Sequence, residues 1–164
     1  MMIHTGISDE ARLEIGQVLN LLLADEYVLY ATTRDYHWNV TGPEFLALHQ
    51  QFEAQTLQLA DWIDSVAERA RAIGVGARGN WVELAKAARS SADAGIGLPA
   101  ERMLAELLTL HEEMVIQLRS DSDTCAQRYK DAGTADFLTG LMVQHEKVAW
   151  FLRAQLETEE AEAS

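Results

Sequence analysis

The spacing of apolar positions predicts long helices along nearly the whole chain. Apolar residues recur every three or four positions, which places them on one face of an α-helix. Segments rich in glycine, serine or asparagine interrupt this pattern near residues 39–41, 74–79, 90–98 and at Gly133. We therefore expect one domain over residues 1–164, with helices over about 8–38, 42–73, 80–89, 99–132 and 134–157.

Residues that favour helix starts stand at each expected N-terminus. Side chains of Ser, Thr, Asp and Asn accept hydrogen bonds from the free N–H groups of a first turn, and Pro lacks the N–H that would otherwise need a partner there. The expected starts are at Ser8 or Asp9, a capping box over 41–44, Asn80, Pro99 and Thr134. Four long helices with one long crossover, which carries the short helix 80–89, predict an all-α, ferritin-like four-helix bundle.

The helix over 42–73 has two different faces. Its apolar stripe consists of Phe45, Leu48, Phe52, Leu59, Ile63, Val66, Ala70 and Ile73. Beside this stripe lies a second face with His49, Glu53, Asp64 and Glu68, interspersed with Leu57 and other uncharged residues. A solvated face rarely mixes an imidazole and carboxylates with leucine and alanine. This face therefore predicts a protein contact, with side chains of the kinds that bind metal ions.

The length of the helix then predicts how such a metal site forms. Asp64 and Glu68 lie one turn apart and can share an ion, whereas His49 lies fifteen residues before Asp64, or about 22 Å along the axis. One chain cannot bring His49 to Asp64. Two copies packed antiparallel across a two-fold axis near Leu57 can, and His37 at the end of the preceding helix would join the same cluster.

Each ligand candidate also has an ordinary interpretation. Asp64 and Glu68 alone would be an exposed acidic pair, and His37 would pack on Trp38 at a helix end. His4, His111 and His145 lack a carboxylate at helical spacing that completes a metal site, so we expect them to be structural or exposed. The sequence contains no Glu-x-x-His motif, the usual di-iron motif of bundle interiors, which favours a site outside the bundle.

Several motifs together resemble the Dps family, the twelve-subunit mini-ferritins. The resemblance rests on His37-Trp38-Asn39-Val40-x-Gly42, Phe45, Leu48-His49, Phe52, Asp64-x-x-Ala67-Glu68-Arg69, Thr134-Ala135-Asp136-Phe137 and Lys147-x-x-x-Phe151. It extends over essentially the whole chain. The ferritin-like fold that it implies agrees with the helix pattern.

The resemblance implies an enzyme, a ferroxidase, with its site between two-fold-related subunits. His37 and His49 would come from one chain and Asp64 and Glu68 from the other, while Glu53 would complete a weaker second position, so that iron binds as a mononuclear or di-iron centre. The expected activity is oxidation of Fe(II), preferably by hydrogen peroxide, with storage of ferric mineral in a hollow homododecamer that protects against oxidative stress. Asp131 and Asp136 would line an acidic entry pore.

The net charge of −13 bears on the alternative functions. Many relatives bind DNA through a basic tail, but residues 1–11 contain no Lys or Arg and the C-terminal tail carries Glu157, Glu159, Glu160 and Glu162. This charge argues against DNA binding, which depends on neutralising phosphates. The alternatives remain a DNA-compacting nucleoid protein with secondary iron chemistry, and a structural shell without catalysis.

The remaining composition favours a cytoplasmic protein, or a nucleoid-associated one under the first alternative. No apolar run approaches the roughly 20 residues of a membrane span, and the first residues lack the pattern of a secretory signal. The single cysteine, Cys125, excludes an internal disulfide and is expected to be a small core residue.

Overall fold

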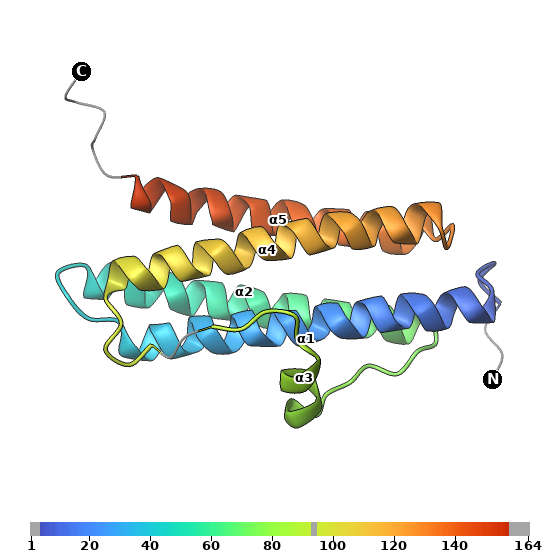
Figure 1. Ribbon diagram of the computed structural model, residues 1–164, viewed down its shortest axis with the longest axis horizontal. Coiled ribbons are helices and arrows are strands. Elements are labelled where there is room, and N and C mark those ends of the chain that lie inside the picture. The colour runs from blue at the N-terminus through green and yellow to red at the C-terminus, as the bar shows by residue number, and fades with distance from the viewer. Residues whose placement is uncertain (1–3, 93–94, 158–164) are drawn as a thin grey trace, which may run out of the picture.

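The computed structural model describes residues 4–92 and 95–157, and its long helices form two antiparallel hairpins that pack into a four-helix bundle. Figure 1 shows the hairpin of α1 and α2 beneath the hairpin of α4 and α5. The predicted ferritin-like arrangement is confirmed. The helices in the described residues are α1 (Asp9–Asn39), α2 (Phe45–Ala72), α3 (Trp81–Ala87), α4 (Ala100–Gln127) and α5 (Ala132–Leu156).

The crossover between α2 and α4 runs back along α1 from one end of the bundle to the other (Figure 1). Two buried side chains of α1 hold it there. The Asn20 amide donates to the carbonyl of Gly76 and accepts from the N–H of Arg78. The Asp25 carboxylate accepts from both the backbone N–H and the Nε–H of Arg89, each at 2.6 Å. These bonds replace the backbone pairing that an irregular segment lacks.

The core lies between the two hairpins and contains most of the apolar stripe predicted for α2. From Leu48 to Ile73, every member of that stripe is buried. Phe45 is the exception at 44% exposed, because it stands in the first turn, where its ring packs on His49 rather than on α4 or α5. Leu13 and Phe151, which lie at helical spacing from other apolar residues of α1 and α5, are likewise exposed.

Of the five predicted helix starts, three are confirmed, among them Pro99 directly before α4, and two are wrong. Ser8 and Asn80 cap α1 and α3 as expected. The predicted capping box over 41–44 is wrong, because Gly42 adopts a φ of +110° and the helix begins only at Phe45; within the described residues, no side chain caps that first turn. Thr134 is not the cap of α5: Asp131 accepts from its N–H instead.

The turn between α4 and α5 explains the remaining difference in helix bounds. The fourth helix ends at Gln127 rather than near 132, and the residues that follow reverse the chain direction. Lys130 takes a left-handed backbone conformation there, with φ at 57°. This conformation interrupts the helix that the apolar pattern alone would continue.

We expect Asp25→Ala to lower the free energy of unfolding by about 1–3 kcal/mol, because it removes the buried carboxylate that accepts from the N–H and the Nε–H of Arg89. Urea denaturation followed by circular dichroism measures the change. Asp123→Ala, which removes an exposed carboxylate from α4, is the matched control. An unchanged midpoint for Asp25→Ala would show that the crossover does not depend on this anchor.

Candidate metal centre

The fold brings the predicted ligands His37 and His49 into direct contact. His37 lies near the end of α1 and is buried, and His49 lies just inside α2 and is partly exposed. The short turn between the two helices folds the chain back, so that the rings stack with centroids 3.9 Å apart and planes 21° apart. We call these two residues the histidine pair.

Reciprocal hydrogen bonds determine the tautomers of the histidine pair. The Nδ1 of His37 lies 2.9 Å from the carbonyl oxygen of His49, and the Nδ1 of His49 lies 2.8 Å from the carbonyl oxygen of His37. A carbonyl oxygen only accepts, so both Nδ1 atoms carry hydrogen. In the neutral rings, both Nε2 atoms then keep a lone pair. Backbone carbonyls orient metal-binding histidines in the same way.

The predicted carboxylate ligands lie elsewhere on α2 and face solvent in the single chain. Asp64, Glu68 and Glu53 are all exposed. Because α2 is continuous from Phe45 to Ala72, Asp64 stays about 22 Å from His49 along the axis. Within the described residues, no group of three or more His, Cys, Asp or Glu side chains of one chain is arranged to hold a metal ion. These carboxylates and the histidine pair can therefore meet only across two chains.

The surface between the two ligand groups has the composition of a contact face. Leu57 lies midway along α2 and is 63% exposed. An exposed leucine between two groups of ligand-type side chains suits an antiparallel helix contact better than open water. The two-fold axis near Leu57 stays a prediction.

The two predicted pore residues have different environments. Asp131 is buried, where it caps α5 and pairs with the Arg69 guanidinium. Burial alone would raise the pKa of Asp131, but hydrogen bonds from Thr134 and the charge of Arg69 together hold that pKa below its ordinary value. Asp136 is exposed one turn further along α5. Only Asp136 presents a free carboxylate to solvent, and the pore itself stays a prediction.

Sequence reasoning missed an arrangement of polar residues inside the bundle. His111 and His145, expected to be structural or exposed, are both buried, and together with Glu26 they form a hydrogen-bonded chain. The signal was present: His111 continues the apolar period of Leu107 and Met114, while His145 continues that of Leu141 and Val148. His4 is exposed.

Two other features do not add a reactive group to the candidate site. Burial, followed by the charges of Asp131 and Asp121, raises the pKa of Cys125 to about 12, so its thiol stays protonated.

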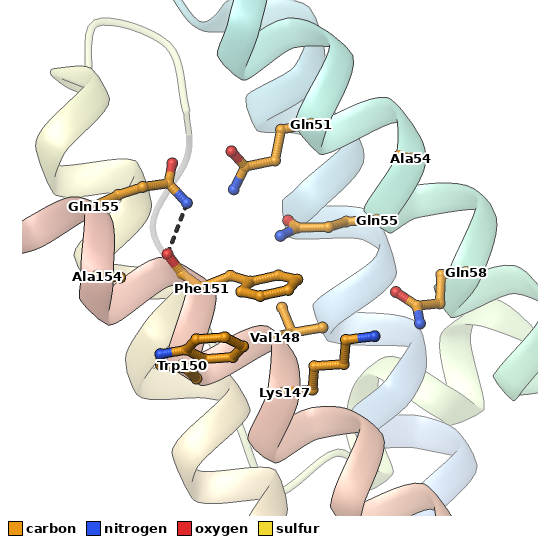
Figure 2. Close-up of a pocket in the computed structure, with 10 residues that line it drawn as sticks. All are labelled: Gln51, Ala54, Gln55, Gln58, Lys147, Val148, Trp150, Phe151, Ala154 and Gln155. Carbon is orange, nitrogen blue, oxygen red and sulfur yellow. Dashed lines mark hydrogen bonds between the residues drawn. The ribbon is translucent and has the colours of Figure 1, made fainter.

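A groove of about 480 Å³ lies between α2 and α5 (Figure 2). Among the ten residues that line it, Lys147 alone is ionisable, and the glutamines that α2 contributes lie on another face from His49.

Comparisons with known proteins place the chain in a family. The Ferritin-like domain family matches residues 16–161. DNA protection during starvation protein 2 of Bacillus anthracis is 36% identical over 146 residues, which cover 87% of this chain and 97% of the relative. The chain belongs to the Dps family.

The chain is also similar to two further proteins, one of them a Dps protein of known structure. An uncharacterized low temperature-induced protein of Nostoc sp. is 40% identical over 158 residues, covering 94% of this chain and 87% of the relative. The crystal structure of the Dps protein from Vibrio cholerae O1 superposes with a TM-score of 0.86 at 27% identity, covering 96% of this chain and 98% of that one. That protein is described as a member of a broad superfamily of ferritin-like diiron-carboxylate proteins. None of the helices in residues 4–92 and 95–157 combines the length and apolar character of a membrane span.

Because Asp131 is buried and Asp136 is exposed, we expect different effects from substituting the two predicted pore residues. We expect Asp136→Asn to slow iron uptake several-fold if Asp136 lines the entry route, because the change removes a negative charge that attracts cations. Asp131→Asn should instead lower the unfolding midpoint, because it weakens the pairing with Arg69. Stopped-flow iron uptake and thermal unfolding distinguish the two effects. An unchanged uptake rate in Asp136→Asn would exclude it from the route.

Proposed function

We propose that this Dps-family protein is a ferroxidase that oxidises Fe(II), preferably with hydrogen peroxide. The ferric product is stored as mineral inside a hollow homododecamer, which protects against oxidative stress. The observation that supports this proposal most strongly is the histidine pair, whose reciprocal carbonyl bonds leave two Nε2 lone pairs free. Imidazole nitrogen suits Fe(II), and the carboxylates on the same helix suit the harder Fe(III).

Each iron site uses residues of two chains. The histidine pair of one chain faces Asp64 and Glu68 of a two-fold-related chain, and the symmetry creates the same site twice. Glu53, one turn after His49, supplies a carboxylate for a second and weaker iron position. Leu57, exposed at the middle of α2, packs near the axis.

The choice of peroxide as oxidant has a chemical advantage. Two Fe(II) ions each give up one electron, and one hydrogen peroxide accepts both electrons with two protons to become two molecules of water. A site that binds iron through few protein ligands leaves coordination positions for the oxidant. Completing the two-electron reduction at the site avoids release of hydroxyl radicals.

We expect Asp64→Ala combined with Glu68→Ala to slow peroxide-driven oxidation by about 100-fold or more, because even indirect partners of metal ligands are worth 10–100-fold. Stopped-flow absorbance of ferric product measures the rate. Glu101→Ala combined with Asp123→Ala, two exposed carboxylates on α4, is the charge-matched control. Light scattering after size exclusion checks that both variants keep the wild-type assembly. A wild-type rate in the α2 variant would refute the proposed site.

The second candidate function is DNA compaction, which the name of the Bacillus anthracis relative favours. The charge of this chain opposes it. The sequence has 13 basic and 26 acidic residues, so a shell of such chains carries a net negative charge and repels phosphate. The tail residues Glu159, Glu160 and Glu162 lie outside the described residues, but their sequence adds negative charge.

We expect the intact protein not to retard duplex DNA at neutral pH and ordinary salt. At that ionic strength, charge interactions decay over about 8 Å. DNA would bind only if the attraction of a local basic patch outweighed the repulsion between its phosphates and the acidic shell. An electrophoretic mobility assay with a chelator excludes bridging by divalent cations. A salt-sensitive shift under these conditions would make DNA binding a joint function.

A further inference from the structure

Three ionisable side chains form a hydrogen-bonded chain inside the bundle. Glu26 of α1, His145 of α5 and His111 of α4 are 0%, 0% and 1% exposed. The Nε2 of His145 lies 2.9 Å from the Oε1 of Glu26, and its Nδ1 lies 2.9 Å from the Nδ1 of His111. Trp62 of α2 packs its ring on His145, with centroids 4.6 Å apart. We call Glu26, His145 and His111 the core triad.

A core triad without net charge, which avoids the cost of an uncompensated buried charge, holds one definite number of protons. Either an imidazolium at His145 donates to an ionised Glu26, or a protonated Glu26 donates to a neutral His145; both arrangements hold the same protons. In both, the Nδ1–H of His145 donates to the Nδ1 of His111, whose own proton is on Nε2. One proton fewer would leave an uncompensated carboxylate in the core, which is costly.

One proton more would break the chain at His111. On His111 the position left for it is Nδ1, because Nε2 already carries hydrogen, so two N–H groups would then face each other across 2.9 Å. The Nε2 of His111 and the Oε2 of Glu26 already lack partners among the described residues, so nothing there compensates the added charge. Burial, and then the charge of His145, accordingly lower the pKa of His111 well below 6.5.

The position of the core triad makes this proton structurally important. Figure 1 shows α1 paired with α2 in one hairpin and α4 paired with α5 in the other. The bond between Glu26 and His145 crosses from the first hairpin to the second. Within the described residues, the titratable groups that hydrogen-bond to the two imidazoles are Glu26 and the imidazoles themselves. Helix α2 contributes the uncharged ring of Trp62, which packs on His145.

We propose that the core triad is an acid-sensitive switch between the two hairpins, and that one further proton at His111 loosens their contact. This switch depends on the bundle interior and not on the proposed iron site. The two proposals can therefore fail independently.

The direction of the pH effect follows from proton linkage. An opened chain binds a proton on His111 near pH 6.5, whereas the closed bundle does not until the pH is much lower. The contribution of His111 to stability is therefore complete above pH 6.5 and is lost as the pH falls below it. One proton changes the folding equilibrium about tenfold per pH unit in this range.

The test compares His111→Asn with the wild type in the full-length, assembled protein. The asparagine side-chain oxygen can accept from the Nδ1–H of His145, but it cannot take up a proton in this range. His4→Asn, which removes an exposed imidazole, is the matched control. Between pH 6.5 and 5, we expect the folding equilibrium constant of the wild type and of His4→Asn to fall with decreasing pH. The fall should be about tenfold larger per pH unit than that of His111→Asn. Urea unfolding at fixed protein concentration measures this difference, and parallel profiles would overturn the proposal.

A second measurement uses the wild type and does not depend on the variant folding. Amide hydrogen exchange by mass spectrometry, corrected for the intrinsic effect of pH, compares peptides over 107–118 and 141–152 with the far ends of α4 and α5. We expect exchange next to the core triad to increase selectively as the pH falls from 7.5 to 5.5. Equal changes along both helices would overturn the switch. The Asp64→Ala and Glu68→Ala variant should keep the wild-type pH profile, because the iron site is not involved.

Discussion

The rigidity of α2 constrains the chemistry of the whole molecule. A continuous helix from Phe45 to Ala72 holds the histidine pair near one end and Asp64 with Glu68 toward the other, and no side-chain rotation closes a separation of about 22 Å. Any metal site that uses both groups must include a second chain. The hairpins add to this constraint, because their packing buries the apolar stripe of α2 and leaves its ligand face outward.

The histidine pair shows how the fold fixes the orientation of two side chains within a single chain. Two rings that bind each other's backbone carbonyl are restricted in orientation and in tautomer. The loss of side-chain freedom is then part of folding rather than part of metal binding. At the far end of the same helix, Arg69 joins α2 to α5 through Thr134 and Asp131, which steadies the turn that carries Glu68.

The sequence predicted the features that depend on helical period and rise. It predicted fewer of the features that depend on which of several neighbouring residues caps a helix or sets a turn. The bundle and the crossover follow from apolar spacing, and the separation of His49 from Asp64 follows from the residue count along α2. The division of ligands between two chains stays a prediction. The capping box failed because the φ of Gly42 delays the helix start, and Thr134 lost the capping role to Asp131 because a carboxylate three residues earlier reaches its N–H. The contact between the rings of His37 and His49 also depends on the short turn, whose shape apolar spacing does not determine.

The core triad is the clearest case in which sequence alone was insufficient, and it bears on where iron can bind. Periodicity places Glu26, His111 and His145 at core positions of three helices, but it does not show that they satisfy one another. In the structure, both nitrogens of His145 are already used, one by Glu26 and one by His111. A cation in the bundle interior would have to displace these bonds, whereas the lone pairs of the histidine pair require no such exchange. The same physical rule, that a buried polar group needs a partner, therefore disfavours a metal ion at the core triad and supports the proposed iron site between chains.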